Sequence, residues 1–282
     1  MPELPEVETI KNDLRAATIG RRIERAEVRD SRVVRHTVNS GFDHAIAGER
    51  IADVGRRAKY LLFRLSSGRY LVVQLLITGQ LLLAESDEPL RRATRLILHL
   101  DDGRQLRLVD NSHLARVHLV EPDELDSKLH MDELGPEPLG AEFTPERLVE
   151  LLRGRGATIK SLLLDQHVVA GLGNIYADEV LFKARLHPAE PAKNLSPDQI
   201  RQLYRAIRET LREAIAYRGT TTRNYLDARG RKGGYQRRLL VFRRQGQPCE
   251  GCPGQVQKIT VAGRQTFICP SCQILSKRAI SK

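Results

Sequence analysis

The sequence has no apolar run that approaches the roughly 20 residues of a membrane-spanning helix. Its opening, MPELPEVETI, is acidic, whereas a secretory signal peptide begins with a basic segment. There is also no internal repeat and no low-complexity tract. These absences predict a cytoplasmic protein with no membrane partner. At 282 residues the chain is long enough for two domains and a small additional module.

Cysteine is missing from most of the chain. The four cysteines all lie near the end, with the spacing C-x2-C-x16-C-x2-C. Each pair can place two thiolates on one metal ion, and the segment between the pairs is long enough for a hairpin. Tetrahedral zinc takes four such ligands. Reversible disulfides or isolated thiols are the alternative, which a chain without a secretion signal disfavours. The sequence therefore predicts one structural Zn²⁺ ion bound by Cys249, Cys252, Cys269 and Cys272.

The chain has 35 acidic residues against 46 lysines and arginines, which gives a formal net charge of +11. This excess favours a polyanionic partner, with nucleic acid as the first candidate and an anionic membrane surface as the rival. Acids dominate residues 121–146, whereas residues 229–244 hold seven basic residues and no acid. A solvated loop is the simplest explanation of such a run. Its place between a glycine-rich turn and the cysteines favours a surface that follows a nucleic-acid backbone.

The hydrophobic period changes along the chain. Alternating segments over 60–77 and 96–108 predict two β-hairpins, and therefore a β-sandwich or barrel over residues 1–134 behind an N-terminal helix that starts at Leu4. Gly135–Gly140 is a proline-containing linker, since each proline disfavours a helical residue before it. Helices are expected at 159–164, at 175–186, and after a capping box at 196–199. We expect a helical domain at 135–228, and a basic lid or linker with the cysteine finger at 229–282.

The segment Gly171–Ala177 matches G-x-G-x-x-A, the dinucleotide-binding pattern. That fingerprint requires a βαβ unit with a following strand that ends in an acid, whereas His187-Pro and another helix follow here. Two helices joined by a glycine turn fit better. The backbone N–H groups of such a turn and the Asn174 amide can face a phosphate, although a plain helix–helix corner is the simpler alternative.

The opening residues Pro2 and Glu3 would have a chemical use if Met1 were removed. The chain would then begin with a secondary amine beside a carboxylate. An α-amino group has a pKa of about 8, well below the value of about 10.4 for lysine, so more of it is uncharged near pH 7. The positive end of the following helix disfavours a protonated amine nearby. The alternative is a frayed acidic terminus without function.

Five segments together resemble the formamidopyrimidine-DNA glycosylase and endonuclease VIII family over nearly the whole chain. They are 2–8 (PELPEVE), 57–60 (RAKY), 134–139 (LGPEPL), 171–177 (GLGNIYA) and the four-cysteine finger. Leu4 in place of glycine indicates the formamidopyrimidine branch. The resemblance implies an α+β multidomain fold with an N-terminal β-sandwich, a helix-two-turn-helix domain and a C-terminal zinc-finger β-hairpin. It implies a bifunctional DNA glycosylase and AP lyase that excises oxidised bases, such as 8-oxoguanine and formamidopyrimidines, with β,δ-elimination.

The resemblance also implies catalytic roles. The freed Pro2 nitrogen attacks C1′ of the damaged nucleotide and forms a Schiff base whose cation assists the eliminations. Glu3 protonates the opening sugar oxygen. Lys59 matches the strand lysine of the family, which holds a phosphate and assists elimination on the 3′ side. Arg264, at a hairpin turn formed by Ala262 and Gly263, clamps phosphates beside the lesion and assists the second elimination. Outside the resemblance, an exposed strand lysine is the simplest interpretation of Lys59.

The resemblance further places DNA contacts at Asn174, Arg95 and Arg155. The family fills the space left by the extruded nucleotide with a methionine from one loop and an arginine–phenylalanine pair from another. This chain differs in both loops, with QLLITG at 74–79 and DNSHLA at 110–115. We call Ile77, His113 and Leu114, which stand at these places, the wedge residues.

Two other functions stay open. The chain could be a relative with shifted lesion choice, acting on oxidised pyrimidines or abasic sites. It could instead be a non-catalytic protein that binds DNA damage, although Pro2, Glu3 and Lys59 argue against this. The expected partner is double-stranded DNA that contains oxidised bases or abasic sites. A monomer at the bacterial nucleoid is expected, and the lesion choice is assigned to a lid around Gly219–Tyr235.

Overall fold

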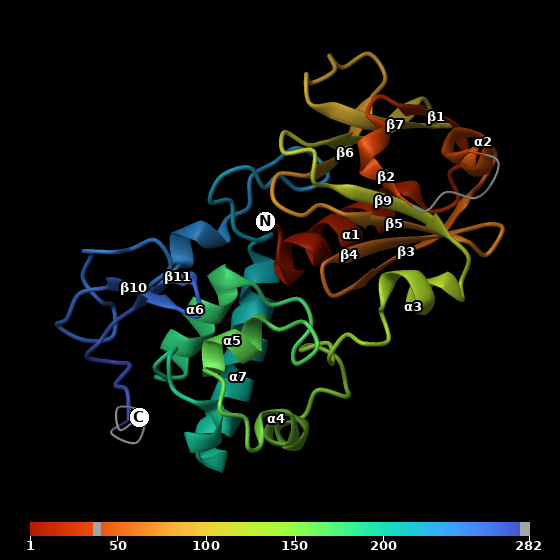
Figure 1. The fold of residues 1–282 in the computed structure, drawn as a ribbon. Coiled ribbons are helices and arrows are strands. Elements are labelled where there is room, and N and C mark those ends of the chain that lie inside the picture. Colours follow the sequence, from red (N-terminus) through yellow and green to blue (C-terminus); the bar gives the residue numbers. More distant parts are fainter. Residues whose placement is uncertain (36–40, 277–282) are drawn as a thin grey trace. The chain divides into compact units, whose positions relative to one another are not determined.

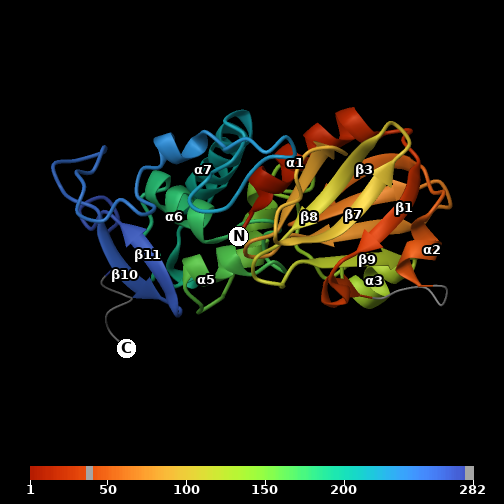
Figure 2. The ribbon, with the colours of Figure 1, turned by 90° about the horizontal axis from the view of Figure 1, so that it is seen from above.

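The computed structural model describes residues 1–35 and 41–276. The chain forms two compact units, both of which are discontinuous in sequence. The first unit comprises Met1–Glu133 and Ile215–Gln236, and the second comprises Leu134–Ala214 and Arg237–Lys282. Figures 1 and 2 show the elements of each unit from two directions.

The first unit contains a four-stranded sheet in the order β1-β7-β8-β6 and a five-stranded sheet in the order β2-β9-β5-β4-β3. All pairings are antiparallel except that of β2 with β9. The strands are β1 (Ile23–Val28), β2 (Val34–Arg35), β3 (Ile51–Arg57), β4 (Tyr60–Leu65), β5 (Tyr70–Gln74), β6 (Gln80–Glu85), β7 (Thr94–Leu100), β8 (Arg104–Val109) and β9 (Arg116–Val120). Short helices accompany them: η1 (Ser31–Val33), α2 (Phe42–Ile46) and α3 (Glu124–Leu129).

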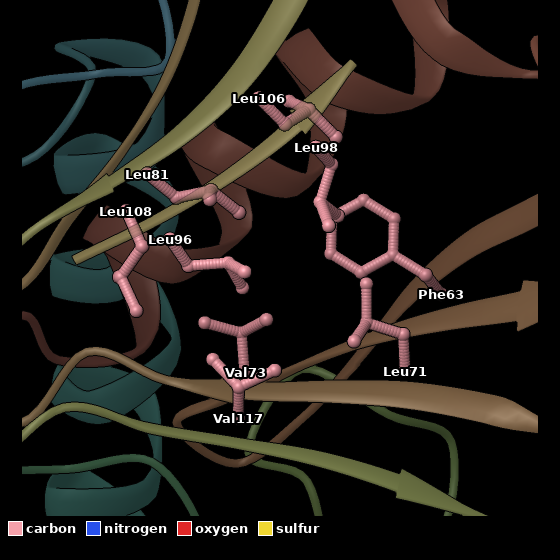
Figure 3. A pocket seen from close by; sticks show the side chains of 9 residues that line it. All are labelled: Phe63, Leu71, Val73, Leu81, Leu96, Leu98, Leu106, Leu108 and Val117. Carbon is pink, nitrogen blue, oxygen red and sulfur yellow. The ribbon is translucent and has the colours of Figure 1, made fainter. Parts of the chain in front are cut away.

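The core of this unit lies between the two sheets. Phe63 and Leu71 point inward from the five-stranded sheet, and Leu96 and Leu98 approach them from the four-stranded sheet (Figure 3). Alternation in the two hairpins puts these side chains on inner faces, because successive residues of a strand point to opposite sides. The predicted β-sandwich is therefore confirmed, with β4–β5 and β7–β8 as the two expected hairpins.

Helix α1 (Leu4–Thr18) adds its apolar face to the same core through Val7, Ile10 and Leu14. Pro5 lies in its first turn, where the missing N–H group has no intrahelical partner to lose. Packing of this face holds the N-terminal end of the helix in a defined place. The first residues of the chain are therefore part of the folded unit.

The helices of the second unit are α4 (Pro145–Leu152), α5 (Ile159–Leu164), α6 (Asn174–Lys183), the short η2 (Ala192–Asn194) and α7 (Pro197–Ala216), whose last two residues belong to the first unit. Three of these, α5, α6 and α7, were predicted from the sequence, although α6 ends three residues earlier than expected, and α4 was not predicted. The expected linker is packed more closely than a flexible connection. Gly135 N–H donates to the Gln166 carbonyl oxygen (2.8 Å), and a Cβ at Gly135 would lie 2.7 Å from the Val168 carbonyl carbon.

After η3 (Tyr235–Arg238), a hairpin forms from β10 (Gln257–Val261) and β11 (Arg264–Ile268). Its turn is Ala262–Gly263, as predicted, and both residues have positive φ (47° and 71°). Positive φ at both residues is typical of two-residue hairpin turns, because the backbone twist of such a turn matches the twist of the flanking strands. In residues 1–35 and 41–276, no helix is both long and apolar enough to cross a membrane.

Candidate active site

The start of the chain is held by its own first helix turn. Pro2 and Glu3 are buried, and the Glu3 backbone N–H donates to Oε2 of Glu6 (2.8 Å). Burial lowers the pKa of the Met1 α-amino group, and the positive charges of Lys59 and Arg223 act in the same direction. Glu3 and Glu6 oppose this shift in the pKa. The structure thus places an amine with reduced proton affinity among two carboxylates and two cations.

Glu6 is a site residue that sequence reasoning missed. Its side chain is 1% exposed, and its second oxygen, Oε1, accepts from the Thr220 backbone N–H (2.7 Å). One carboxylate therefore joins the first turn of α1 to the start of the lid, Gly219–Tyr235. Gly219 has a φ of +78°, and a Cβ there would lie 2.8 Å from Oε1. An acid three residues after an N-cap was the available sequence signal.

Lys59 is not a strand residue, which corrects the sequence-based assignment. It lies with Ala58 in the two-residue turn between β3 and β4, because Arg57 pairs with Tyr60 and closes the hairpin. Ala58 has a φ of 49°. The turn brings Lys59 close enough to act on the pKa of the terminal amine.

The lid is fixed to the first unit by several side chains. Tyr225 is 7% exposed and belongs to the sandwich core. Asp227 is 1% exposed and accepts from Arg218 Nε (3.0 Å) and from the Arg231 backbone N–H (2.8 Å). Arg218 also pairs with Asp13 on α1. Anchors on both sides therefore leave Arg223 at an exposed part of the lid.

The two wedge loops share one buried acid, Asp110. Its carboxylate accepts from the Thr78 hydroxyl, from the Ser112 backbone N–H (3.0 Å) and from the Ala115 backbone N–H (2.8 Å). Burial alone would raise the pKa of Asp110, but these hydrogen bonds outweigh burial and lower it. Between these anchors, Ile77 and Leu114 are 55% and 44% exposed. Two apolar side chains are thus presented to solvent by loops with fixed bases.

His113 has a different environment from the other two wedge residues. Its Nδ1 lies 2.7 Å from Asp30 Oδ2, and its Nε2 lies 3.0 Å from Arg95 Nη2. Arg95 also donates through Nε to the Asp110 carbonyl oxygen (2.9 Å). A hydrogen bond from Arg32 has the largest effect on the pKa of the Asp30 carboxyl and holds it well below its usual range. The structure therefore brings His113 and Arg95 together in one polar network.

The remaining predicted contacts lie in the second unit. Asn174 opens α6, and its Nδ2 donates to the Gln265 carbonyl oxygen on β11 (2.9 Å). Arg264 begins β11 and is exposed. Arg155 is exposed in the segment between α4 and α5. Within this unit the structure connects Asn174 with the hairpin that carries Arg264.

The four cysteine sulfur atoms form one cluster, in which all lie within 4.8 Å of one another. Two Sγ–Sγ distances are 3.8 and 3.4 Å. A tetrahedron with Zn–S bonds of about 2.3 Å requires sulfur atoms about 3.8 Å apart, so the donor set fits zinc. The Gly254 backbone N–H donates to Cys252 Sγ (3.3 Å) and lowers the pKa of that thiol to about 7. The cluster can bind a metal ion.

Comparisons with known proteins agree with this arrangement. A family model described as the formamidopyrimidine-DNA glycosylase N-terminal domain matches residues 1–117, and the H2TH domain model of the same family matches residues 134–225. Formamidopyrimidine-DNA glycosylases of Pelotomaculum thermopropionicum and Chloroflexus aurantiacus are 46% and 45% identical to the chain. Each alignment covers 97% of the chain and 99% or 98% of the relative.

Solved structures give the same result. A Lactococcus lactis FPG variant in complex with a Fapy-dG containing DNA has a TM-score of 0.90 and 34% identity, covering 97% of this chain and all of that chain. The Lactococcus lactis Fpg complex with an abasic site containing DNA has a TM-score of 0.89 and 34% identity, with 96% and 99% covered.

Proposed function

The chain belongs to the formamidopyrimidine-DNA glycosylase family, and from this premise we propose how its own residues excise an oxidised base from DNA. It is a DNA glycosylase for oxidised bases, with the AP lyase activity that is typical of the family. The observation that carries the residue assignments is the start of the chain, where Pro2 is buried and the charges of Glu3, Glu6 and Lys59 act on the pKa of the α-amino group.

Pro2 is the nucleophile in this proposal. Removal of Met1 would transfer the free amine to Pro2, whose ring is already buried at the start of α1. The nitrogen lone pair attacks C1′, the bond from C1′ to the base breaks, and the base leaves with the bonding electrons and a proton. Glu3 protonates the ring oxygen as the sugar opens. The product is a cationic iminium that accepts electron density in the following eliminations.

Cationic side chains hold the DNA backbone. Lys59, near the amine, holds a phosphate and assists elimination on the 3′ side. Arg264 contacts phosphates beside the lesion and assists the second elimination. Arg155 adds a phosphate contact. Asn174 and Arg95 act more indirectly in this proposal, because Asn174 supports the β11 hairpin and Arg95 supports His113.

The wedge is apolar in this proposal. Ile77 and Leu114 fill the space left by the extruded nucleotide, since they are the exposed tips of two loops that Asp110 fixes. Extrusion costs a few kcal/mol, which contacts with the wedge and lid offset. His113 contributes through the loop conformation, because Asp30 and Arg95 occupy its ring nitrogens.

Zinc is the metal that the cysteine cluster fits. Cys249, Cys252, Cys269 and Cys272 would hold one structural ion, which stabilises the fold of the segment that ends in the β10–β11 hairpin. The ion supplies no bond-breaking chemistry in this proposal. Its role is to keep the hairpin ordered.

The partner is double-stranded DNA with oxidised bases or abasic sites, bound by a monomer at the nucleoid in the cytoplasm. The basic excess and the similar structures, which hold DNA with such lesions, support this. Oxidised purines are the favoured substrates. Oxidised pyrimidines are a second candidate, because a similar Lactococcus lactis structure contains an oxidized pyrimidine containing DNA.

Covalent trapping tests the nucleophile. Borohydride reduces the Schiff base and links an active protein to abasic DNA. A tag retained before Pro2 should abolish trapping and leave DNA binding nearly intact, while a C-terminal tag should preserve both. Undiminished trapping with the retained tag would show that a lysine is the nucleophile.

A further inference from the structure

A buried ion pair in the second unit lies directly behind the hairpin that carries Arg264. Lys160 on α5 and Asp178 on α6 are both 0% exposed, and Lys160 Nζ lies 2.6 Å from Asp178 Oδ1. The ammonium donates two further hydrogen bonds, to Thr266 Oγ1 (2.7 Å) and to the Gln265 carbonyl oxygen (3.2 Å). Lysine has three donors, so each of them reaches a partner in this arrangement.

These contacts continue to the backbone of Arg264 itself. The Thr266 hydroxyl accepts from Lys160 and donates to the Arg264 carbonyl oxygen (3.0 Å). On the other side, Asp178 Oδ2 accepts from the Phe267 backbone N–H (3.0 Å). Side chains of α5 and α6 therefore hold the backbone of Gln265 and Phe267 directly, and they reach the backbone of Arg264 through the Thr266 hydroxyl.

Stability alone gives a weak reason for such a pair. Burial of two charges costs several kcal/mol per ion, and well-packed apolar residues in their place are often equally stable. Burial raises the pKa of Asp178 to about 7 even though the Lys160 ammonium opposes this. What an apolar pair would not provide is the set of directed hydrogen bonds to Thr266, Gln265 and Phe267.

The hairpin needs an external support because it is only two strands wide. An isolated two-stranded hairpin is at best marginally stable in water. Arg264 is exposed at the turn, and its long side chain must be ordered before it can make a directional contact with a phosphate. A small displacement of a group that acts in a reaction reduces the rate strongly.

We propose that Lys160 and Asp178 are positioning residues for Arg264, and that they set the efficiency of the second elimination through the Thr266 hydroxyl and the β11 backbone. This inference rests on the role proposed above for Arg264. Neither residue touches DNA in the proposal. Their effect is confined to the step that Arg264 assists.

The test uses three variants. The first is a double variant that carries both Lys160→Met and Asp178→Leu, the second is Arg264→Ala, and the third carries all three substitutions. The double variant removes both charges, so no unpaired buried charge remains. Circular dichroism and zinc content report folding. Borohydride trapping reports the Schiff base, and single-turnover assays on abasic DNA give the ratio of δ- to β-elimination products.

We expect the double variant to fold, to retain zinc and to trap abasic DNA normally, while the δ-to-β product ratio falls about tenfold or more. Arg264→Ala should produce the same loss, and the combined variant should lose little more, because both changes act through one group. A folded double variant with the wild-type ratio overturns the inference if Arg264→Ala lowers the ratio. A wild-type ratio in Arg264→Ala itself refutes the proposed role of Arg264.

Thr266→Val keeps the test decisive if the double variant does not fold. It removes only the hydroxyl that connects Lys160 with the Arg264 carbonyl oxygen, and the side-chain volume is nearly unchanged. A several-fold lower product ratio with normal trapping supports the inference. A folded Thr266→Val protein with the wild-type ratio contradicts it.

Discussion

Gly219→Ala is the sharpest test of the link between the lid and the amino terminus. The new Cβ would lie 2.8 Å from Glu6 Oε1 and 2.9 Å from Glu6 Cγ, so the carboxylate must move. That carboxylate accepts from the backbone N–H groups of Glu3 and Thr220. A change of one hydrogen atom to a methyl group therefore disturbs the base of the lid and the first turn of α1 together.

Gly230→Ala is a matched control. Gly230 has a φ of +75°, close to the +78° of Gly219, but nothing lies within 4 Å of its added Cβ. Left-handed strain of about 1–2 kcal/mol, partly offset by the lower entropy of the unfolded chain, applies to both variants. Gly219→Ala also disturbs hydrogen bonds to a buried carboxylate, which adds about 1.5–3 kcal/mol.

We expect Gly230→Ala to lower the free energy of unfolding by about 1 kcal/mol and Gly219→Ala to lower it by about 3 kcal/mol. Urea unfolding of both variants measures the difference. Borohydride trapping under conditions in which both are folded should be slow for Gly219→Ala and normal for Gly230→Ala. Equal destabilisation, or normal trapping by Gly219→Ala, would refute the coupling through Glu6.

Three further predictions concern stability, metal and lesion context. Hydrogen bonds from Arg69 and from the Ser66–Ser67 turn outweigh burial and lower the pKa of Glu49 to about 2, so this group stabilises the fold above pH 4.5 and loses its contribution as the pH falls toward 2. Glu49→Gln should remove about 3 kcal/mol of acid-dependent stability, measured by urea unfolding between pH 6 and pH 2.5. Cys269→Ser should release zinc, weaken DNA binding and make its salt dependence shallower, whereas normal binding by the metal-free variant would contradict this. The excision rate of one lesion should be measured with each of the four bases opposite it. We expect discrimination among these opposite bases to be weaker by about 1–3 kcal/mol than the discrimination by a wedge that hydrogen-bonds the orphaned base. A strong cytosine preference that is unchanged by His113→Ala would show that another residue reads that base.

Periodicity and turn chemistry predicted much of the fold because local and tertiary preferences agree there. Helix α5 was predicted at the observed bounds, and in the structure the Thr158 side chain caps its first turn. Lys59 was misplaced for the opposite reason. Ala58 adopts a positive φ without the glycine or asparagine that normally signals such a turn, so no residue type in the sequence indicates that the strand stops there.

Long-range polar contacts account for what the sequence could not reveal. Asp30 binds His113 across 83 residues, and Lys160 binds Thr266 across 106 residues. No spacing rule connects such pairs, because the fold creates their proximity. The same holds for the lid. It follows the helical segment in sequence, yet buried Tyr225 and Asp227 place it with the first unit.

Buried acids perform a common task in this basic protein. Glu6, Asp110 and Asp178 are each at most 1% exposed, and each accepts a hydrogen bond from a backbone N–H group in a segment of the proposed site: the lid, a wedge loop and β11, respectively. A carboxylate accepts several N–H groups at once, and the low dielectric of the interior strengthens these bonds. Burial also keeps these negative charges away from the surface, where they would repel a polyanion. The exposed cations can therefore attract DNA, while the buried carboxylates fix backbone segments of the proposed site, as expected for a site whose groups are ordered before the substrate arrives.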